Sequence, residues 1–210
     1  GLVGVDFRKT DDNRFNSAIA APAQGGFVSY VNREVRNFNT NLVANARQTF
    51  NGVHNVSGLI GTEYRRDFSE SQLVRGDGLP GPFFKVLSAT ATPVTAAGIN
   101  SEWRLGSYFG NVKYNYDEKY FVSAVLRYDG HSRFGNETRW GFFPSLSGAW
   151  RISEEDFFDV GAIDELKLRI GYGTTGNSAI GNFASRGLYS AAGSYQGSTG
   201  LRPTQLANVN

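Results

Sequence analysis

The sequence contains no cysteine, no methionine and no long apolar run. The absence of cysteine excludes a disulfide scaffold and a metal site with thiolate ligands. A transmembrane helix needs about 18 or more consecutive apolar residues, so the sequence excludes that kind of span as well. A strong excess of one charge is also missing, because the formal net charge is +2 over 210 residues. The electrostatic argument for a nucleic-acid partner is therefore absent, and we predict none.

The clearest pattern present lies between Trp140 and Ile152, where apolar residues alternate with mostly small or polar ones. This alternation is typical of a β-strand with one face in lipid and the other in water. Trp140 and Trp150 are separated by roughly 33 Å along such a strand. At the tilt of a barrel strand the separation becomes about 25 Å of height, which matches the two aromatic girdles of an outer-membrane barrel.

The pattern predicts an all-β fold, specifically an antiparallel transmembrane β-barrel. Girdle aromatics are expected on one face, at Tyr114, Tyr116, Tyr120, Tyr128, Trp140, Trp150 and Tyr172. We predict about seven strands, at residues 1–9, 26–50, 54–67, 102–117, 119–131, 139–152 and 164–174, and a short eighth at 185–190. Short turns at 51–54, 117–119 and 153–164 alternate with longer loops at 10–25, 68–101 and after 174, and 131–138 is intermediate. Residues 154–158 are expected to form a single helical turn.

Three blocks of sequence resemble the SusC/RagA family of TonB-dependent outer-membrane transporters. They are SYFGNVKYNYDEKY at 107–120, LRYDGHSRFG at 126–135 followed by RWGFFPSLSGAWRISEE at 139–155, and LKLRIGYGTTGN at 166–177. The blocks occur in the order and spacing of the family. Residues 1–100 match it in layout more than in letters. His131 departs from the family pattern, which usually carries a small polar residue there.

The resemblance implies a piece of a 22-stranded barrel with a plugged lumen. Residues 1–210 would then be a partial barrel domain, and we expect the plug domain, the TonB box and the signal peptide to lie outside it. The implied function is uptake of oligosaccharides or oligopeptides across a Gram-negative outer membrane. The implied partners are the lipid bilayer, the glycan or peptide substrate, a SusD-like surface lipoprotein that acts as a lid, and the TonB complex acting through the plug. No catalytic residue, metal or cofactor is expected.

Two alternatives remain open at the level of sequence. The first is a complete small barrel that acts as an adhesin or a passive pore. The second is a barrel hydrolase, for which Asp129, His131 and Ser132 offer a Ser-His-Asp set, although Ser132 would point away from His131 on a strand. We do not favour metal binding by His54 and His131, because the predicted topology places them at opposite ends of the wall. Gly171–Gly176 matches a dinucleotide-binding pattern by letter, but no carboxylate follows to bind a ribose, so we interpret it as coincidence.

Six residues are candidates for substrate contact. Asp129, Arg133 and Arg139 either form a charged rim that orients substrate or hold the 132–138 loop to the wall, and we favour the second interpretation. Phe83, Phe84 and Trp103 either stack on sugar rings or pack a loop, with equal weight for each.

Overall fold

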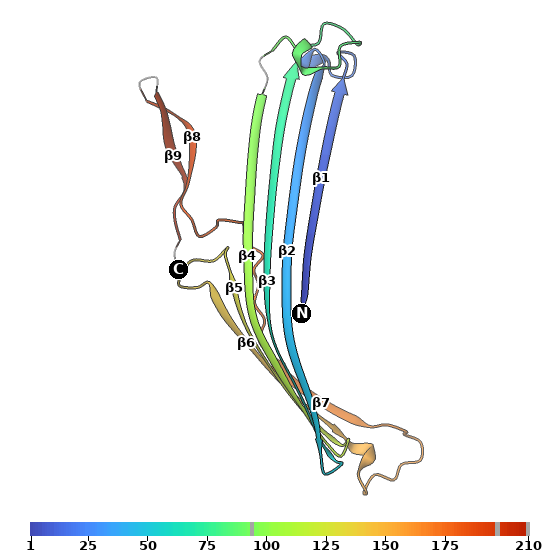
Figure 1. Ribbon diagram of the computed structural model, residues 1–210. Coiled ribbons are helices and arrows are strands. Elements are labelled where there is room, and N and C mark those ends of the chain that lie inside the picture. Colours follow the sequence, from blue (N-terminus) through green and yellow to red (C-terminus); the bar gives the residue numbers. More distant parts are fainter. Residues whose placement is uncertain (93–94, 196–197, 209–210) are drawn as a thin grey trace. The chain divides into compact units, whose positions relative to one another are not determined.

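The computed structural model describes residues 1–92, 95–195 and 198–208. Seven strands form one sheet in the order β1 to β7, and β8 and β9 form a separate two-stranded sheet (Figure 1). The first four strands are β1 (Leu2–Asn16), β2 (Phe27–Phe50), β3 (His54–Asp77) and β4 (Thr95–Tyr116). The others are β5 (Tyr120–His131), β6 (Trp140–Arg151), β7 (Lys167–Gly173), β8 (Leu188–Tyr195) and β9 (Ser198–Gln205). The all-β, antiparallel class is thereby confirmed.

Short 3-10 helices are the only helical elements in the described part of the chain: η1 (Pro22–Gln24), η2 (Leu87–Ala89) and η3 (Ile152–Glu154). None of the described helices is long and apolar enough to cross a membrane. The sheet order runs linearly from β1 to β7, and the described strands do not close it into a complete barrel.

The chain divides into two compact units, each with its own contacts. The first unit comprises Gly1–Val3, Asn39–Arg65 and Arg104–Asn210. The second comprises Gly4–Phe38 and Arg66–Trp103. In the second unit the connections 17–26 and 78–94 are joined by backbone hydrogen bonds, such as those that Gly78 N donates to the carbonyls of Gln24 and Gly26, at 3.0 and 2.9 Å.

The register of the first unit places side chains of one kind on one face. Tyr116 pairs with Tyr120, Tyr120 with Trp150, and Trp150 with Leu168, so these four side chains share a face. From Gly106 to Tyr172, no strand residue of β4–β7 on that face is charged; we call it the apolar face. Several of its large side chains are exposed, including Ile170 and Tyr172, which are both 78% exposed. The opposite face, here called the polar face, carries all the charged residues of those strands in this range.

The strands extend further than the sequence predicts. β3 continues to Asp77 and β4 begins at Thr95, so the predicted loop at 68–101 was wrong and shortens to 78–94. β1 likewise continues to Asn16 instead of ending near residue 9. These extensions mix polar and apolar residues without a regular alternation between the two faces. Their backbone hydrogen bonds hold the strands together without the apolar alternation that a sequence pattern detects.

Two further expectations need correction. The predicted eighth strand at 185–190 lies at 188–195 and pairs with β9, which the sequence did not predict. β9 contains Gly200 and Pro203 and has no apolar alternation, which removes the usual strand signal. The helical turn expected at 154–158 is instead the 3-10 turn η3, which lies earlier in the chain.

The Gly130–Trp140 pair provides a test of the apolar face. A Cβ atom on Gly130 would lie 2.7 Å from the Trp140 ring, whereas one on Gly58 would have its nearest neighbour at 3.8 Å. Gly130→Ala should therefore displace the indole and lower the stability of the intact protein by about 1–3 kcal/mol. Tryptophan fluorescence and urea unfolding would measure both effects. Gly58→Ala is the matched control, and equal effects of the two variants would contradict the register.

Candidate functional site

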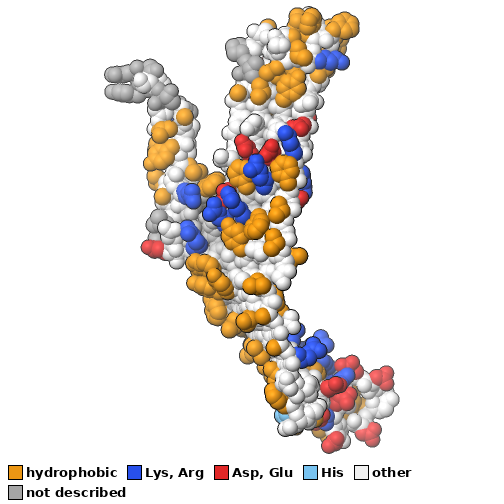
Figure 2. Space-filling view, viewed as in Figure 1, with side chains coloured by type: hydrophobic (Ala, Val, Ile, Leu, Met, Phe, Trp, Pro, Cys, Tyr) orange, Lys and Arg blue, Asp and Glu red, His pale blue; other side chains and the backbone are white. Residues whose placement is uncertain are grey.

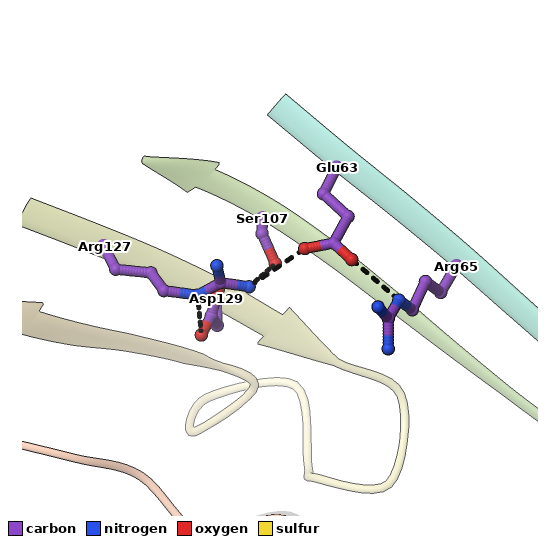
Figure 3. A network of polar contacts seen from close by, with 5 residues as sticks. All are labelled: Glu63, Arg65, Ser107, Arg127 and Asp129. Carbon is purple, nitrogen blue, oxygen red and sulfur yellow. Dashed lines mark hydrogen bonds and ion pairs between the residues drawn. The ribbon is translucent and has the colours of Figure 1, made fainter. Parts of the chain in front are cut away.

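A charged cluster occupies the polar face of the first unit (Figure 3). Its centre is Arg127, whose Nε donates to Asp129 Oδ2 at 2.8 Å and whose Nη2 donates to Ser107 Oγ at 3.0 Å. The same Nη2 donates to Glu63 Oε2 at 3.2 Å, and Arg65 Nε lies 2.7 Å from Glu63 Oε1. Two arginines and two carboxylates are thus joined across β3, β4 and β5.

Local packing explains why Arg127 lies where it does. Gly61 has no side chain, and a Cβ atom there would lie 2.6 Å from the Phe109 ring. That ring occupies the space over Gly61, and the Arg127 guanidinium lies 5.5 Å from its centroid. Ser107, beneath the cluster, is 1% exposed. A guanidinium held between an aromatic ring and two carboxylates has a fixed orientation, so the cluster is a preorganised polar surface.

A small cavity of about 240 Å³ adjoins the cluster. Its lining includes Asp129, His131, Phe134, Arg139 and Asn177. Two buried atoms of that lining, Asp129 Oδ1 and Arg139 Nε, have no hydrogen-bond partner within the described part of the chain. A group that donates to the carboxylate and accepts from the guanidinium would satisfy both. The cavity therefore has the chemistry to hold a hydroxyl, an amide or ordered water.

The structure brings Asp129 and Arg139 to this cavity but gives Arg133 other contacts. Arg133 Nε donates to Asn182 Oδ1 at 2.6 Å, and its Nη1 donates to the Ser178 carbonyl at 2.9 Å. Arg139 Nη2 donates to Asn136 Oδ1 at 2.6 Å. Both arginines thus hold the 132–139 connection, in line with the structural interpretation. Contact of Asp129, Arg133 and Arg139 with substrate stays a prediction.

The aromatic candidates belong to the second unit. Phe83 and Phe84, on the connection between β3 and β4, are 91% and 50% exposed, and Trp103 is half-buried on β4. Ile19, on the connection between β1 and β2, and Val86 are exposed as well. We call Ile19, Phe83, Phe84 and Val86 the tip residues. Exposed apolar groups of this size on hydrogen-bonded loops suit contact with a ligand or a partner.

The hydrolase set is not assembled. Asp129 Oδ2 accepts from Arg127, and Ser132 Oγ accepts from the backbone N–H of Arg104 at 2.8 Å. His131 Nδ1 accepts from the backbone N–H of Arg133 at 3.2 Å, so that nitrogen does not donate to a carboxylate. The structural context that a dinucleotide site requires is also missing, because residues 174–180, after β7, are not helical. Within the described ranges no three His, Asp or Glu side chains gather to hold a metal.

Aromatic side chains line both ends of the apolar face. Tyr116 stacks on Tyr120 and Tyr120 on Trp150, with centroids 6.2 and 6.5 Å apart. At the other end Tyr128 stacks on Trp140 at 4.9 Å. Tyr114 shares a hydrogen bond of 2.8 Å with His54 Nδ1. The seven residues predicted as girdle aromatics all lie on this face by register, and their contact with lipid headgroups stays a prediction.

Residues 2–210 match the family model described as TonB dependent receptor-like, beta-barrel. The chain belongs to this family. It is 32% identical over 217 aligned residues to TonB-dependent receptor P39 of Formosa agariphila. This alignment covers 98% of this chain and 20% of P39. It is 47% identical over 87 residues to TonB-dependent receptor SusC of Bacteroides thetaiotaomicron, covering 40% of this chain and 9% of SusC.

The fold of a solved structure agrees. The RagAB peptide importer in its closed-closed state superposes with a TM-score of 0.90 at 22% identity, over 98% of this chain and 23% of that chain. The chain spans about a fifth of the length of P39. The resemblance to SusC/RagA receptors is therefore confirmed. The matched relatives are receptors and not enzymes, as predicted.

Because the chain belongs to the receptor family, the medium that each face of the sheet contacts can be assigned. In a transmembrane barrel the apolar face contacts lipid and the polar face lines the lumen. Sequence reasoning selected Asp129 but missed Arg127 and Glu63. Arg127 was detectable, because a residue two positions before Asp129 on a strand shares its face. Glu63 was not, because only the sheet brings it to a residue 64 positions later in the chain.

Removing Arg127, the central arginine of the charged cluster, should lower the stability of the receptor. Arg127→Gln leaves Glu63 and Asp129 without their shared donor, so we expect the intact receptor to lose about 1–3 kcal/mol of stability. Arg65→Gln removes a more exposed partner of Glu63 and should cost less than about 1 kcal/mol. Guanidinium unfolding of the receptor in detergent would compare them. Equal losses would show that Arg127 does not organise the cluster.

The turn after β6 should respond to pH. Glu155 accepts hydrogen bonds from the Tyr120 hydroxyl and from Trp150 Nε1, the latter at 2.9 Å. These donors lower the pKa of the Glu155 carboxyl below its ordinary value of 4.5. The charged carboxylate is favoured in the folded state, so its contribution is present above the ordinary pKa and is lost as pH falls through the lowered one.

Trp150 fluorescence would report this loss in a receptor in which Trp103, Trp140 and any tryptophan outside residues 1–210 are replaced by phenylalanine. We expect an acid transition below the ordinary pKa of glutamate. Glu155→Gln should abolish that transition, and Glu154→Gln should leave it unchanged. A transition that survives Glu155→Gln would assign it to another group.

Proposed function

We propose that this chain forms part of the wall of a TonB-dependent transporter in the outer membrane of a Gram-negative bacterium. The whole receptor would import oligosaccharides or oligopeptides too large for passive pores. The observation that carries the proposal is the division of the sheet into a charge-free face and a charged face. Such a wall suits a protein with lipid outside and an aqueous, polar path inside. Family membership supports the same conclusion.

Residues 1–210 would serve as part of the barrel domain of the receptor. A plug and a TonB box would be contributed by other parts of the receptor, in line with a chain that spans about a fifth of the length of P39. TonB would act through that plug to release substrate. The candidate residues Asp129 and Arg139 would face the substrate path through the cavity beside the charged cluster.

A SusD-like lipoprotein would be the lid partner. The tip residues support this assignment, because Phe83 and Ile19, each 91% exposed, offer apolar contact area for another protein. The structural relative RagAB is a peptide importer, which supports an oligomeric cargo, and SusC is a second related receptor. Glycan or peptide cargo would pass between lid and barrel, with Phe83, Phe84 and Trp103 available for stacking.

The passive-pore and adhesin alternatives have no comparable support. The matched relatives are TonB-dependent receptors, and a pore or an adhesin would not need TonB. The hydrolase alternative lacks its assembled triad.

Uptake by cells that carry the intact receptor tests the main proposal. Labelled oligosaccharide and oligopeptide mixtures should accumulate in cells with TonB and not in cells that lack it. Accumulation that is equal in both strains would establish passive passage and overturn the proposal. A receptor that takes up neither mixture in either strain would also contradict it.

Co-purification tests the lid. Phe83→Ser/Phe84→Ser should reduce recovery of the partner lipoprotein with the intact receptor, because two exposed apolar anchors are lost. The matched control is Phe157→Ser, an exposed phenylalanine on the connection between β6 and β7. Equal recovery from the two variants would remove the tip residues from the lid interface.

A further inference from the structure

Four cations on the polar face of the first unit have no acidic partner. They are Arg47, Lys113, Lys167 and Arg169, and we call them the basic strip. Within the described residues, no carboxylate oxygen lies within 4.0 Å of their charged groups. Arg47, Lys113 and Arg169 line one hollow of about 680 Å³, to which Glu118, in the turn between β4 and β5, contributes a carboxylate. The three cations outnumber this one acid, and an excess of cations in a concave site raises the local concentration of anions.

The sheet register places these cations near one another from distant parts of the chain. Lys113 lies in the row Lys113–Ser123–Ser147–Gly171 that crosses β4 to β7. Arg169 lies in the next row, opposite Ala149, with Phe121 one strand further on. With strands about 4.8 Å apart and the two rows offset by two residues along the strands, the backbones of Lys113 and Arg169 are separated by about 16 Å. The strip therefore extends over a length that suits an oligomer rather than a single small ion.

Other cations of the polar face, unlike those of the basic strip, do have acidic partners. Arg127 contacts both Glu63 and Asp129, and Arg151 lies 3.7 Å from Glu154 and 3.6 Å from Glu165. Glu63 and Asp129 are the only acids on the polar face of the described strands of the first unit, and both belong to the charged cluster. Figure 2 shows further acidic side chains around the β6–β7 connection, beyond the strands.

The groups between the cations are suited to a hydroxylated ligand. The Lys167 Nζ lies 4.0 Å from the centroid of the Phe121 ring, which holds the ammonium against an aromatic surface. Ser57, Ser123, Ser147, Asn55 and Asn115 supply hydroxyl and amide groups to the same hollow. Aromatic and hydroxyl groups recognise a sugar ring, while arginine and lysine bind carboxylate or sulfate.

We propose that the basic strip binds the acidic groups of a transported oligosaccharide that carries carboxylates or sulfates. This inference rests on the proposed transport function and narrows its substrate class. Lys113 and Arg169 would contact successive anionic groups of one oligomer, and Lys167 would pair with an acidic group beside the Phe121 ring. Neutral oligosaccharides would lack these contacts and bind more weakly.

Binding of oligogalacturonate to the intact receptor tests the proposal, with its fully methyl-esterified form as the neutral match. Calorimetry should show that the acid form binds about tenfold more tightly or better, with an affinity that falls as salt rises. Lys113→Gln/Arg169→Gln should remove this preference and leave binding of the ester unchanged. Lys119→Gln, which changes a turn cation beside Asp117, should alter neither.

Two results would overturn the assignment. One is equal affinity for the acid and the ester in the unmodified receptor. The other is a carbodiimide cross-link between Lys113 or Lys167 and a carboxylate elsewhere in the intact receptor, formed equally well with and without oligogalacturonate. That result would show that the basic strip binds another part of the receptor and not the substrate. Either result leaves TonB-dependent uptake of neutral oligomers untouched, so failure of this proposal is distinguishable from failure of the transport function.

Discussion

A sheet that separates lipid from water must place every charge on one side, and this constraint governs the first unit. The backbone of each strand inside the sheet satisfies its polar groups through its two neighbours, which leaves only side chains to be sorted. From Gly106 to Tyr172 the apolar face of β4–β7 carries no charged residue. A shift of any strand by one position would exchange its faces and put Arg127 or Lys113 into lipid. The register is thus fixed by the cost of burying charge.

The polar face then divides its charges in two ways. Around Arg127 the cations and carboxylates neutralise one another and form an ordered surface beside a small polar cavity. Around Lys113 and Arg169 the cations have no such partners and face a larger hollow. One set of charges serves to organise the wall, and the other is available to a ligand. The same strands carry both, because each row of the sheet brings together residues from several parts of the chain.

Small residues are what allow aromatic rings to lie flat on this thin sheet. Gly130 leaves room for Trp140 on the apolar face, and Gly61 leaves room for Phe109 on the polar face. The first arrangement stacks Trp140 with Tyr128, and the second supports the guanidinium of Arg127. The aromatic girdle and the charged cluster thus both depend on a glycine on the neighbouring strand, which leaves space for an aromatic ring.

Local alternation in the sequence determined the class of fold, the two faces and the positions of four strands to within a few residues: Phe27–Phe50, Tyr120–His131, Trp140–Arg151 and Lys167–Gly173. It did not determine the extensions of β1, β3 and β4 or the β8–β9 pair, because strands without an apolar alternation are held by backbone hydrogen bonds that leave no periodic signal. Asp129 was identifiable as a candidate from its motif. Its contacts with Arg127, and through it with Glu63, were decided only by the tertiary structure, since sheet register and not sequence distance makes those residues neighbours.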